Sequence, residues 1–172
     1  MNRIILAITL SSALALGACK KEPPESTPPL PEDVATTPTP APMATNAANM
    51  PGSQSHFASA MAGADTIYFD TDRYNIDGED AAALRRQAEY MLQYPSSTAT
   101  VEGHADERGT RDYNLALGER RATAAMNYLV SLGVPQNRLR VVSYGEERPT
   151  ATGQNESAWA RNRRSVTVMI GR

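Results

Sequence analysis

Nine of the chain's twelve prolines lie in one segment, between Pro23 and Pro51, and this segment limits where the chain can fold. The remaining residues from Lys20 to about His56 are mostly Thr, Ala and Ser. Such a composition cannot bury enough apolar surface to offset the entropy that is lost on folding. We therefore predict a disordered, extended tether over residues 19–58 and one folded domain over residues 59–172.

The first eighteen residues have the pattern of a signal peptide. Arg3 precedes an apolar run that is too short to span a bilayer comfortably and that ends in small residues. The run ends in LGAC, residues 16–19, which resembles the bacterial lipobox. This resemblance implies cleavage after residue 18 and acylation of Cys19. Lys20, directly after it, favours the outer membrane by the same resemblance. The alternative is an unpaired thiol in an exported protein, since Cys19 is the only cysteine.

Beyond the tether, β-branched and aromatic runs alternate with segments of helical periodicity. Strands are predicted in TIYFDTD, TATVEGHAD, RLRVVSYG and SVTVMI. Helices are predicted from the N-cap Asp77 to before Pro95, from the N-cap Thr110 to Gly133, and over residues 156–162. This alternation predicts an α/β (α+β) fold, a two-layer sandwich with the element order β-α-β-α-β-α-β.

One arginine of the second long helix is predicted to point into the protein. At about 100° per residue, Arg121 falls inside the apolar stripe that contains Leu117 and Leu129, whereas Arg120 falls at its edge. A buried guanidinium needs polar partners, because an unpaired buried charge is very costly. Asp106 leaves the second predicted strand shortly before this helix and is the candidate neighbour.

Two interpretations of Asp106 and Arg121 remain open at this point. They could form a plain internal salt bridge, since structural ion pairs are common. Alternatively they could stay apart and hold a zwitterion, with the carboxylate taking an ammonium and the guanidinium taking a carboxylate.

Several separate motifs resemble one known family. The segments IYFDTDRYNI, VEGHADERGTRDYNLALGERRATAAMNYL, VVSYGEERP and ARNRRSVTVMI, in this order, closely resemble the peptidoglycan-associated lipoproteins. More widely, they resemble the C-terminal peptidoglycan-binding domain of outer membrane protein A. The resemblance implies an OmpA-like fold with a mixed four-stranded sheet and non-covalent binding of peptidoglycan through the diaminopimelate of its stem peptide. It assigns this binding to Asp106 and Arg121, places Asn114 in the same site, and has Phe69 and Asp70 lining it.

The same resemblance implies partners and a location. The chain is expected at the outer membrane, anchored by lipid on Cys19 with its domain in the periplasm, within the Tol-Pal system that supports envelope integrity and cell division. TolB and TolA are the expected protein partners. The alternative function is mainly docking to TolB and TolA, with Asp106 and Arg121 as a structural salt bridge.

Other classes of function find little support in the sequence. A net charge of −2 gives no reason to expect nucleic-acid binding. The predicted domain has one histidine, no cysteine and no nucleophile motif, so we expect neither an enzyme nor a cofactor. A metal site built from His104, Asp106 and Glu107 is conceivable, but closed transition-metal sites need more nitrogen or sulfur ligands, and His104 is expected to be structural.

Overall fold

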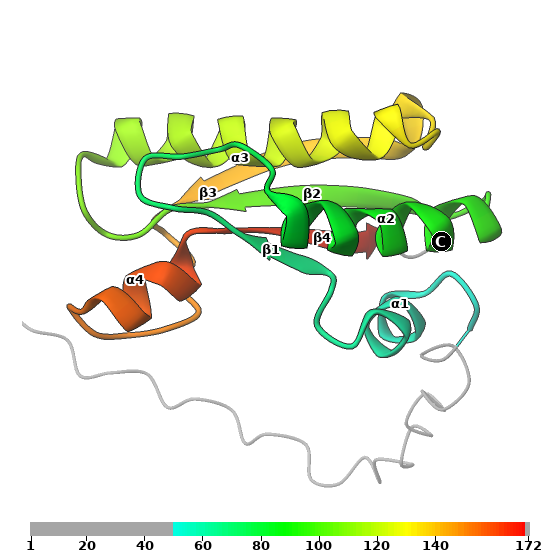
Figure 1. Cartoon of the computed structure of the whole chain (residues 1–172), viewed down its shortest axis with the longest axis horizontal. Helices are drawn as coiled ribbons and strands as arrows, with labels where there is room; N and C mark the ends of the chain where they lie inside the picture. The colour runs from blue at the N-terminus through cyan, green and yellow to red at the C-terminus, as the bar shows by residue number, and fades with distance from the viewer. Residues whose placement is uncertain (1–49, 171–172) are drawn as a thin grey trace, which may run out of the picture. The chain divides into compact units, whose positions relative to one another are not determined.

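The computed structural model describes residues 50–170, and these residues form four helices, four strands and one short 3-10 turn (Figure 1). The signal peptide over residues 1–18, the lipid site Cys19 and most of the predicted tether lie outside the described residues. In chain order the elements are α1 Gln54–Met61, β1 Thr66–Tyr68, α2 Gly78–Gln93, β2 Thr98–His104, α3 Arg111–Ser131, η1 Gln136–Arg138, β3 Leu139–Gly145, α4 Glu156–Asn162 and β4 Arg164–Ile170.

The four strands form one mixed sheet in the order β1-β4-β2-β3. Strands β2 and β3 are parallel, whereas β4 runs antiparallel to both β1 and β2. Helices α2 and α3 lie together on one side of the sheet, as Figure 1 shows. The predicted two-layer α/β fold with a mixed four-stranded sheet is therefore confirmed.

The core lies between the sheet and these two helices. It contains buried side chains from every strand and from α1 to α3, among them Phe57, Ile67, Leu84, Met91, Val101, Leu129, Leu139 and Met169. The predicted caps also form: the Asp77 side chain accepts from the Asp80 N–H, and the Thr110 side chain accepts from the Tyr113 N–H. The polar residues that begin α2 and α3 thus fix where the two helices start.

Helix α3 approaches the sheet most closely where two glycines meet. A Cβ atom added to Gly103 of β2 would lie 1.8 Å from the carbonyl oxygen of Gly118. Only the absence of both side chains allows this contact between helix and strand. This contact also fixes the distance between α3 and the end of β2. Gly118 lies one helical turn before Arg121, so the contact helps to position Arg121.

The predicted boundary between tether and domain at residue 59 is wrong, because α1 begins at Gln54. The Phe57 side chain is fully buried in the core, and the His56 Nδ1 lies 2.6 Å from the Tyr90 hydroxyl. The Gln54 side-chain oxygen also accepts a hydrogen bond from the Met169 N–H of β4. In the sequence, only Phe57 and Met61, one turn apart, indicated this helix.

Replacing Phe57 with alanine should lower the free energy of unfolding by about 3–5 kcal/mol, because a fully buried aromatic side chain leaves a cavity. Urea denaturation of the full chain measures the change. The matched control is Ser59→Ala on the exposed face of α1, which should shift stability by less than about 0.5 kcal/mol. Equal unfolding midpoints for the two variants would mean that α1 is not part of the cooperative domain.

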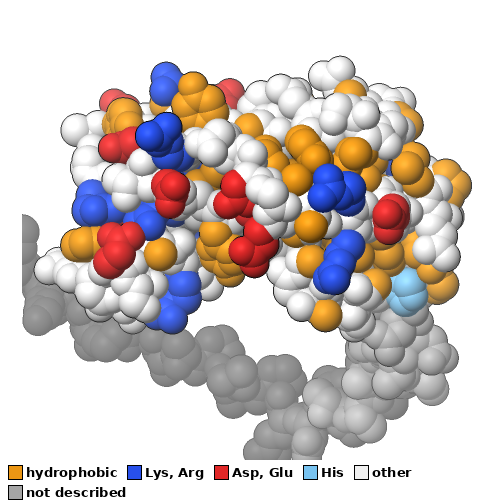
Figure 2. Space-filling view, viewed as in Figure 1, with side chains coloured by type: hydrophobic (Ala, Val, Ile, Leu, Met, Phe, Trp, Pro, Cys, Tyr) orange, Lys and Arg blue, Asp and Glu red, His pale blue; other side chains and the backbone are white. Residues whose placement is uncertain are grey.

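Two features of the described residues concern membranes and charge. None of the helices within residues 50–170 is long and apolar enough to cross a bilayer. On the face drawn in Figure 2, basic and acidic side chains are interspersed. No field of a single sign covers that face, as the nearly balanced charge of the sequence predicts.

Candidate functional site

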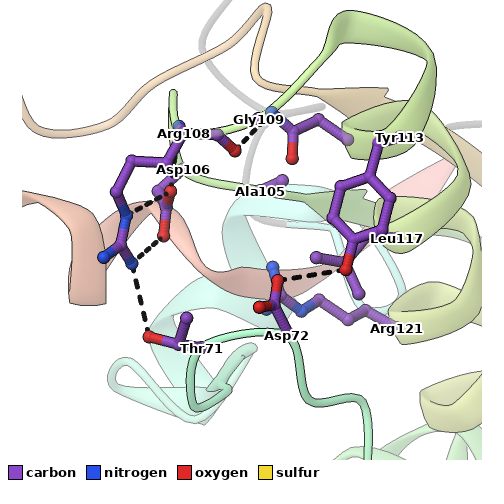
Figure 3. Close-up of a pocket in the computed structure, with 10 residues that line it drawn as sticks. Thr71, Asp72, Ala105, Asp106, Arg108, Gly109, Tyr113, Leu117 and Arg121 are labelled. Atoms are coloured by element: carbon purple, nitrogen blue, oxygen red, sulfur yellow. Dashed lines mark hydrogen bonds and ion pairs between the residues drawn. The ribbon is translucent and has the colours of Figure 1, made fainter.

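A pocket of about 300 Å³ lies where β2 ends and α3 begins. Its walls come from the loop between β1 and α2, the loop between β2 and α3, and the first turns of α3 (Figure 3). The lining residues are Thr71, Asp72, Ala105, Asp106, Arg108, Gly109, Tyr113, Asn114, Leu117 and Arg121. The pocket therefore contains three of the five binding residues predicted from the sequence.

Arg121 is fully buried, as the helical periodicity predicts, and among residues 50–170 no carboxylate forms an ion pair with it. Its guanidinium donates to three main-chain carbonyls: Nε to Arg73 at 2.9 Å, Nη1 to His104 at 2.8 Å and Nη2 to Asp70 at 3.1 Å. Within residues 50–170 no carboxylate oxygen lies within 4 Å of it. These carbonyls occupy three of the five N–H groups that a guanidinium offers.

Burial, together with the nearby Arg163 charge, lowers the pKa of Arg121 to about 10. The group still remains protonated at neutral pH. A buried cation that lines a pocket and donates only to main-chain carbonyls attracts an anion from outside, although the charges of Asp106 and Asp72 also act on it. The arrangement therefore suits a ligand carboxylate.

Asp106 lies in the same pocket and is 6% exposed. Its carboxylate accepts from Arg108 through Nε at 3.0 Å, Nη2 at 2.8 Å and the backbone N–H at 3.1 Å. Arg163 donates to it from the buried side through Nη1, at 3.4 Å. Burial acts to raise the pKa of Asp106, but the hydrogen bonds from Arg108 outweigh it and the pKa is lowered. The carboxylate is therefore ionised at neutral pH.

Asp106 and Arg121 line one pocket without contacting each other. No ion pair joins them in the described part of the chain, so the internal salt bridge considered from the sequence is wrong. Each has partners that the sequence analysis did not identify: Arg108 and Arg163 for Asp106, and main-chain carbonyls for Arg121. The spacing of Arg108, two residues after Asp106, was the only local signal.

Asn114 takes part in the site through the loop that precedes α3. It is 1% exposed, and its side-chain nitrogen donates to the Arg108 carbonyl at 3.1 Å and to the Glu146 carboxylate. It thus ties the Arg108 loop to the end of β3. Asn114 lines the same pocket as Asp106 and Arg121, and its part in ligand binding stays a prediction.

Phe69 and Asp70 are not among the lining residues of this pocket but lie directly behind it, against Arg121, and their part in ligand binding stays a prediction. The Phe69 ring is buried, with the Arg121 guanidinium carbon 5.3 Å from its centroid. Asp70 contributes only its carbonyl to Arg121. The pocket wall comes from the two following residues, Thr71 and Asp72.

Tyr113 forms a further part of the wall that the sequence analysis missed. Its hydroxyl donates to the Asp72 carboxylate at 3.1 Å, across the pocket from Arg108 in Figure 3. The loop between β1 and α2 is thereby held on both sides of the pocket, by Tyr113 of α3 on one side and by Arg108 on the other, whose Nη2 lies 3.3 Å from the Thr71 hydroxyl.

The conceivable metal site at His104 does not form. His104 is 1% exposed and stacks on Tyr144 at 5.5 Å between ring centroids. Neither ring nitrogen has a hydrogen-bond partner in the part of the chain that the structure describes. Glu107 instead accepts from the Trp159 indole N–H at 3.2 Å. In residues 50–170 no three acidic, histidine or cysteine side chains are grouped to hold a metal ion.

The buried His104 should make stability depend on pH. Burial, with the Arg164 and Arg148 charges, lowers its pKa from 6.5 to about 4, although Glu102 lies 3.7 Å away. Between these values the unfolded chain binds a proton that the native state does not, so acidification favours unfolding. We expect the free energy of unfolding to fall by about 2 kcal/mol from pH 7 to pH 5 through this group.

Urea denaturation at the two pH values, on the wild type and on His104→Phe, isolates this contribution. Phenylalanine keeps the stacking on Tyr144 and cannot titrate, so its pH dependence should be smaller by about 2 kcal/mol. Identical pH dependence in both proteins would show that the native His104 takes up the proton as readily as the unfolded chain.

Comparisons with known proteins agree on one family. Residues 68–163, more than half of the chain, match the OmpA family. The peptidoglycan-associated lipoprotein of Rhizobium meliloti (strain 1021) is 47% identical over 170 residues, which covers 99% of this chain and 89% of that protein. That of Brucella melitensis biotype 1 is 49% identical over 121 residues, or 70% of this chain and 71% of that protein.

Solved structures show the same fold. The peptidoglycan-associated lipoprotein from Burkholderia pseudomallei aligns with a TM-score of 0.60 at 41% identity, covering 61% of this chain and 89% of that one. The C-terminal domain of Helicobacter pylori MotB aligns with a TM-score of 0.56 at 22% identity, covering 61% and 83%, and shares the fold. This chain therefore belongs to the OmpA family and, within it, to the peptidoglycan-associated lipoproteins.

Proposed function

We propose that this chain links the outer membrane to the cell wall by binding the diaminopimelate of peptidoglycan stem peptides without covalent chemistry. The observation that carries the proposal is Arg121, a fully buried cation that lines a pocket and has no carboxylate partner within the described residues. Diaminopimelate ends in a carboxylate and an ammonium on one carbon. The carboxylate fits Arg121, and the ammonium fits Asp106.

The start of α3 adds to the attraction for a carboxylate. Tyr113 and Asn114, in the first turns of this helix, line the pocket. The N-terminal end of a helix carries a partial positive charge and favours anions. Lysine, the stem-peptide residue of other walls, offers an ammonium without the neighbouring carboxylate and would leave Arg121 uncompensated.

The remaining predicted residues have positioning roles in this proposal. Phe69 and Asp70 hold the Arg121 guanidinium, one through its ring and one through its carbonyl. Asn114 holds the loop that carries Arg108.

The proposed anchor is the lipid on Cys19, followed by the proline-rich tether. A tether that confines the domain near the wall raises its effective concentration for stem peptides, so a modest affinity at each site is sufficient. The relatives named peptidoglycan-associated lipoproteins are consistent with this role. Docking to TolB and TolA, and with it a part in envelope integrity and cell division, is proposed from the family resemblance alone.

Co-sedimentation with purified peptidoglycan tests the proposed function. The full chain in detergent should sediment with diaminopimelate-type walls and remain in the supernatant with lysine-type walls. Free meso-diaminopimelate should release it, and free lysine should not. Equal sedimentation with both walls would overturn the assignment to diaminopimelate.

A further inference from the structure

The Asp106 carboxylate is already occupied in the free protein. Arg108 binds it in a bidentate manner, with Nε 3.0 Å from Oδ1 and Nη2 2.8 Å from Oδ2. Arg163 and the Arg108 backbone N–H take further acceptor positions. An incoming ammonium therefore cannot reach both oxygens while the Arg108 side chain stays in place.

The two arginines at Asp106 differ in how firmly they are held. The Arg163 side chain is 6% exposed and donates to the Phe69 carbonyl at 2.9 Å and to Glu156 at 2.6 Å, so it is fixed beneath the carboxylate. The Arg108 side chain is 39% exposed and lines the pocket together with Asp106. Arg108 is thus the cation that can leave.

The Arg108 guanidinium makes a second contact that does not depend on the carboxylate, and it makes this contact while it is bound to Asp106. Its guanidinium carbon lies 4.3 Å from the centroid of the Trp159 ring. A guanidinium over an indole gains cation–π attraction even when it is open to water. Glu107, next in the chain to Arg108, holds the Trp159 indole in place through a 3.2 Å hydrogen bond.

We propose that Arg108 is a built-in competitor for the ammonium of the ligand: it occupies the Asp106 carboxylate in the free protein and gives it up when the ligand binds, while it keeps its contact with Trp159. The inference rests on the proposed function and adds to it the exchange of one cation for another. In this exchange Asp106 is paired with Arg108 before binding and with the ligand ammonium after it, and Arg163 stays paired with Asp106 throughout. A lone cation gains little at Asp106, because it must displace Arg108 without a carboxylate to bind Arg121.

The exchange also opens the pocket. Arg108 Nη2 bridges Asp106 to the Thr71 hydroxyl, and this bridge joins the two loops on one side of the cavity (Figure 3). Displacement breaks this bridge and leaves the Tyr113–Asp72 hydrogen bond on the other side. The Arg108 backbone N–H stays on Asp106 and preserves the orientation of the carboxylate.

Calorimetric titration of the full chain in detergent tests the proposal on the wild type and on Arg108→Gln. The probes are a diaminopimelate stem peptide and the analogue that lacks the terminal ammonium but keeps the carboxylate. Removing the competitor should strengthen binding of the first probe about three- to tenfold, the range expected for a partly exposed bidentate ion pair. Binding of the analogue should not become stronger, because it does not need to displace Arg108.

The matched control is Arg111→Gln. Arg111 lies two residues before Tyr113, pairs with Glu147 at 2.6 Å and does not contact Asp106, so its loss changes the net charge equally. It should leave both affinities within about twofold of the wild type, because an exposed charge outside the pocket acts only through a screened field.

The outcomes separate this inference from the proposed function. No binding of either probe by the wild type would overturn the proposed function and this inference together. Binding by the wild type that weakens in Arg108→Gln would make Arg108 a direct contact of the ligand and would overturn only the competition. An affinity of Arg108→Gln for the stem peptide equal to that of the wild type would also contradict the competition by Arg108.

A second measurement does not depend on the variant. The Arg108 Nε–H resonance of the wild type, assigned by NMR, should be protected from solvent exchange in the free protein and should lose that protection when the stem peptide saturates the site. Retained protection at saturation would show that Arg108 stays on Asp106.

Discussion

Replacing Arg121 with glutamine should weaken binding of a diaminopimelate stem peptide by about a hundredfold or more. Truncating one partner of a buried, hydrogen-bonded charge pair generally costs about 2–5 kcal/mol of binding free energy. Arg121 is fully buried, lines the pocket and is the charged side chain proposed to bind the ligand carboxylate. Calorimetric titration of the full chain measures the loss.

Two comparisons make this result specific. Arg120→Gln removes the same charge from the exposed side of the same helix and should bind like the wild type. Arg121→Lys keeps the charge but cannot hold a carboxylate in bidentate fashion, so it should bind with intermediate affinity.

Stability must be measured on the same variants, because Arg121 also serves the fold. Arg121 donates hydrogen bonds to the main-chain carbonyls of Asp70, Arg73 and His104. A shorter glutamine side chain leaves some of these buried carbonyls without a donor. We expect a loss of about 2–3 kcal/mol in the free energy of unfolding. A folded Arg121→Gln protein that binds as tightly as the wild type would contradict the role assigned to this residue.

Gly103→Ala adds a single methyl group and should greatly lower the free energy of unfolding. The added Cβ would lie 1.8 Å from the Gly118 carbonyl oxygen and 2.6 Å from its carbonyl carbon, so the backbone of α3 or β2 has to move. Overpacking against backbone atoms should lower the free energy of unfolding by about 3 kcal/mol or more. Because Gly118 lies one turn before Arg121, the same shift should also weaken ligand binding.

Urea denaturation measures this effect, with Gly78→Ala as the control. A Cβ at Gly78 meets no atom within 4 Å, and Gly78 is the first residue of α2. Alanine there should be neutral or stabilising by up to about 1 kcal/mol. A Gly103→Ala protein as stable as the Gly78→Ala protein would show that α3 is not held against β2 at this point.

Local rules predicted most of the fold and the inward direction of Arg121. Neighbouring residues along the chain predict the N-caps Asp77 and Thr110 and the alternation of strands and helices. The structure has both caps and this alternation. The apolar stripe of α3 likewise placed Arg121 in the interior. Each of these features depends on contacts within a few residues along the chain.

The partners of the buried charges could not be predicted in the same way. The carbonyls that bind Arg121 belong to Asp70, Arg73 and His104, from two other parts of the chain. Arg163, beneath Asp106, comes from the end of α4, and no periodicity connects these residues. Only the folded sheet brings them together.

The missed α1 has a different cause. Its sequence, QSHFASAM, has weak helical periodicity, and the helix is held by tertiary contacts of Phe57 and His56 with the core and with Tyr90. Short helices are stabilised mainly by such packing rather than by intrinsic preference. A fragment that begins at residue 59 would cut through this helix.

The most direct test of the central claim is a calorimetric comparison of two stem peptides on the wild-type full chain, one with diaminopimelate and one with lysine at the same position. The account predicts measurable binding of the diaminopimelate peptide and at least a hundredfold weaker binding of the lysine peptide, because only the first supplies a carboxylate to Arg121. Equal affinities, or no binding of either peptide by the folded protein, would show that Arg121 is a structural charge and that the pocket does not recognise the wall.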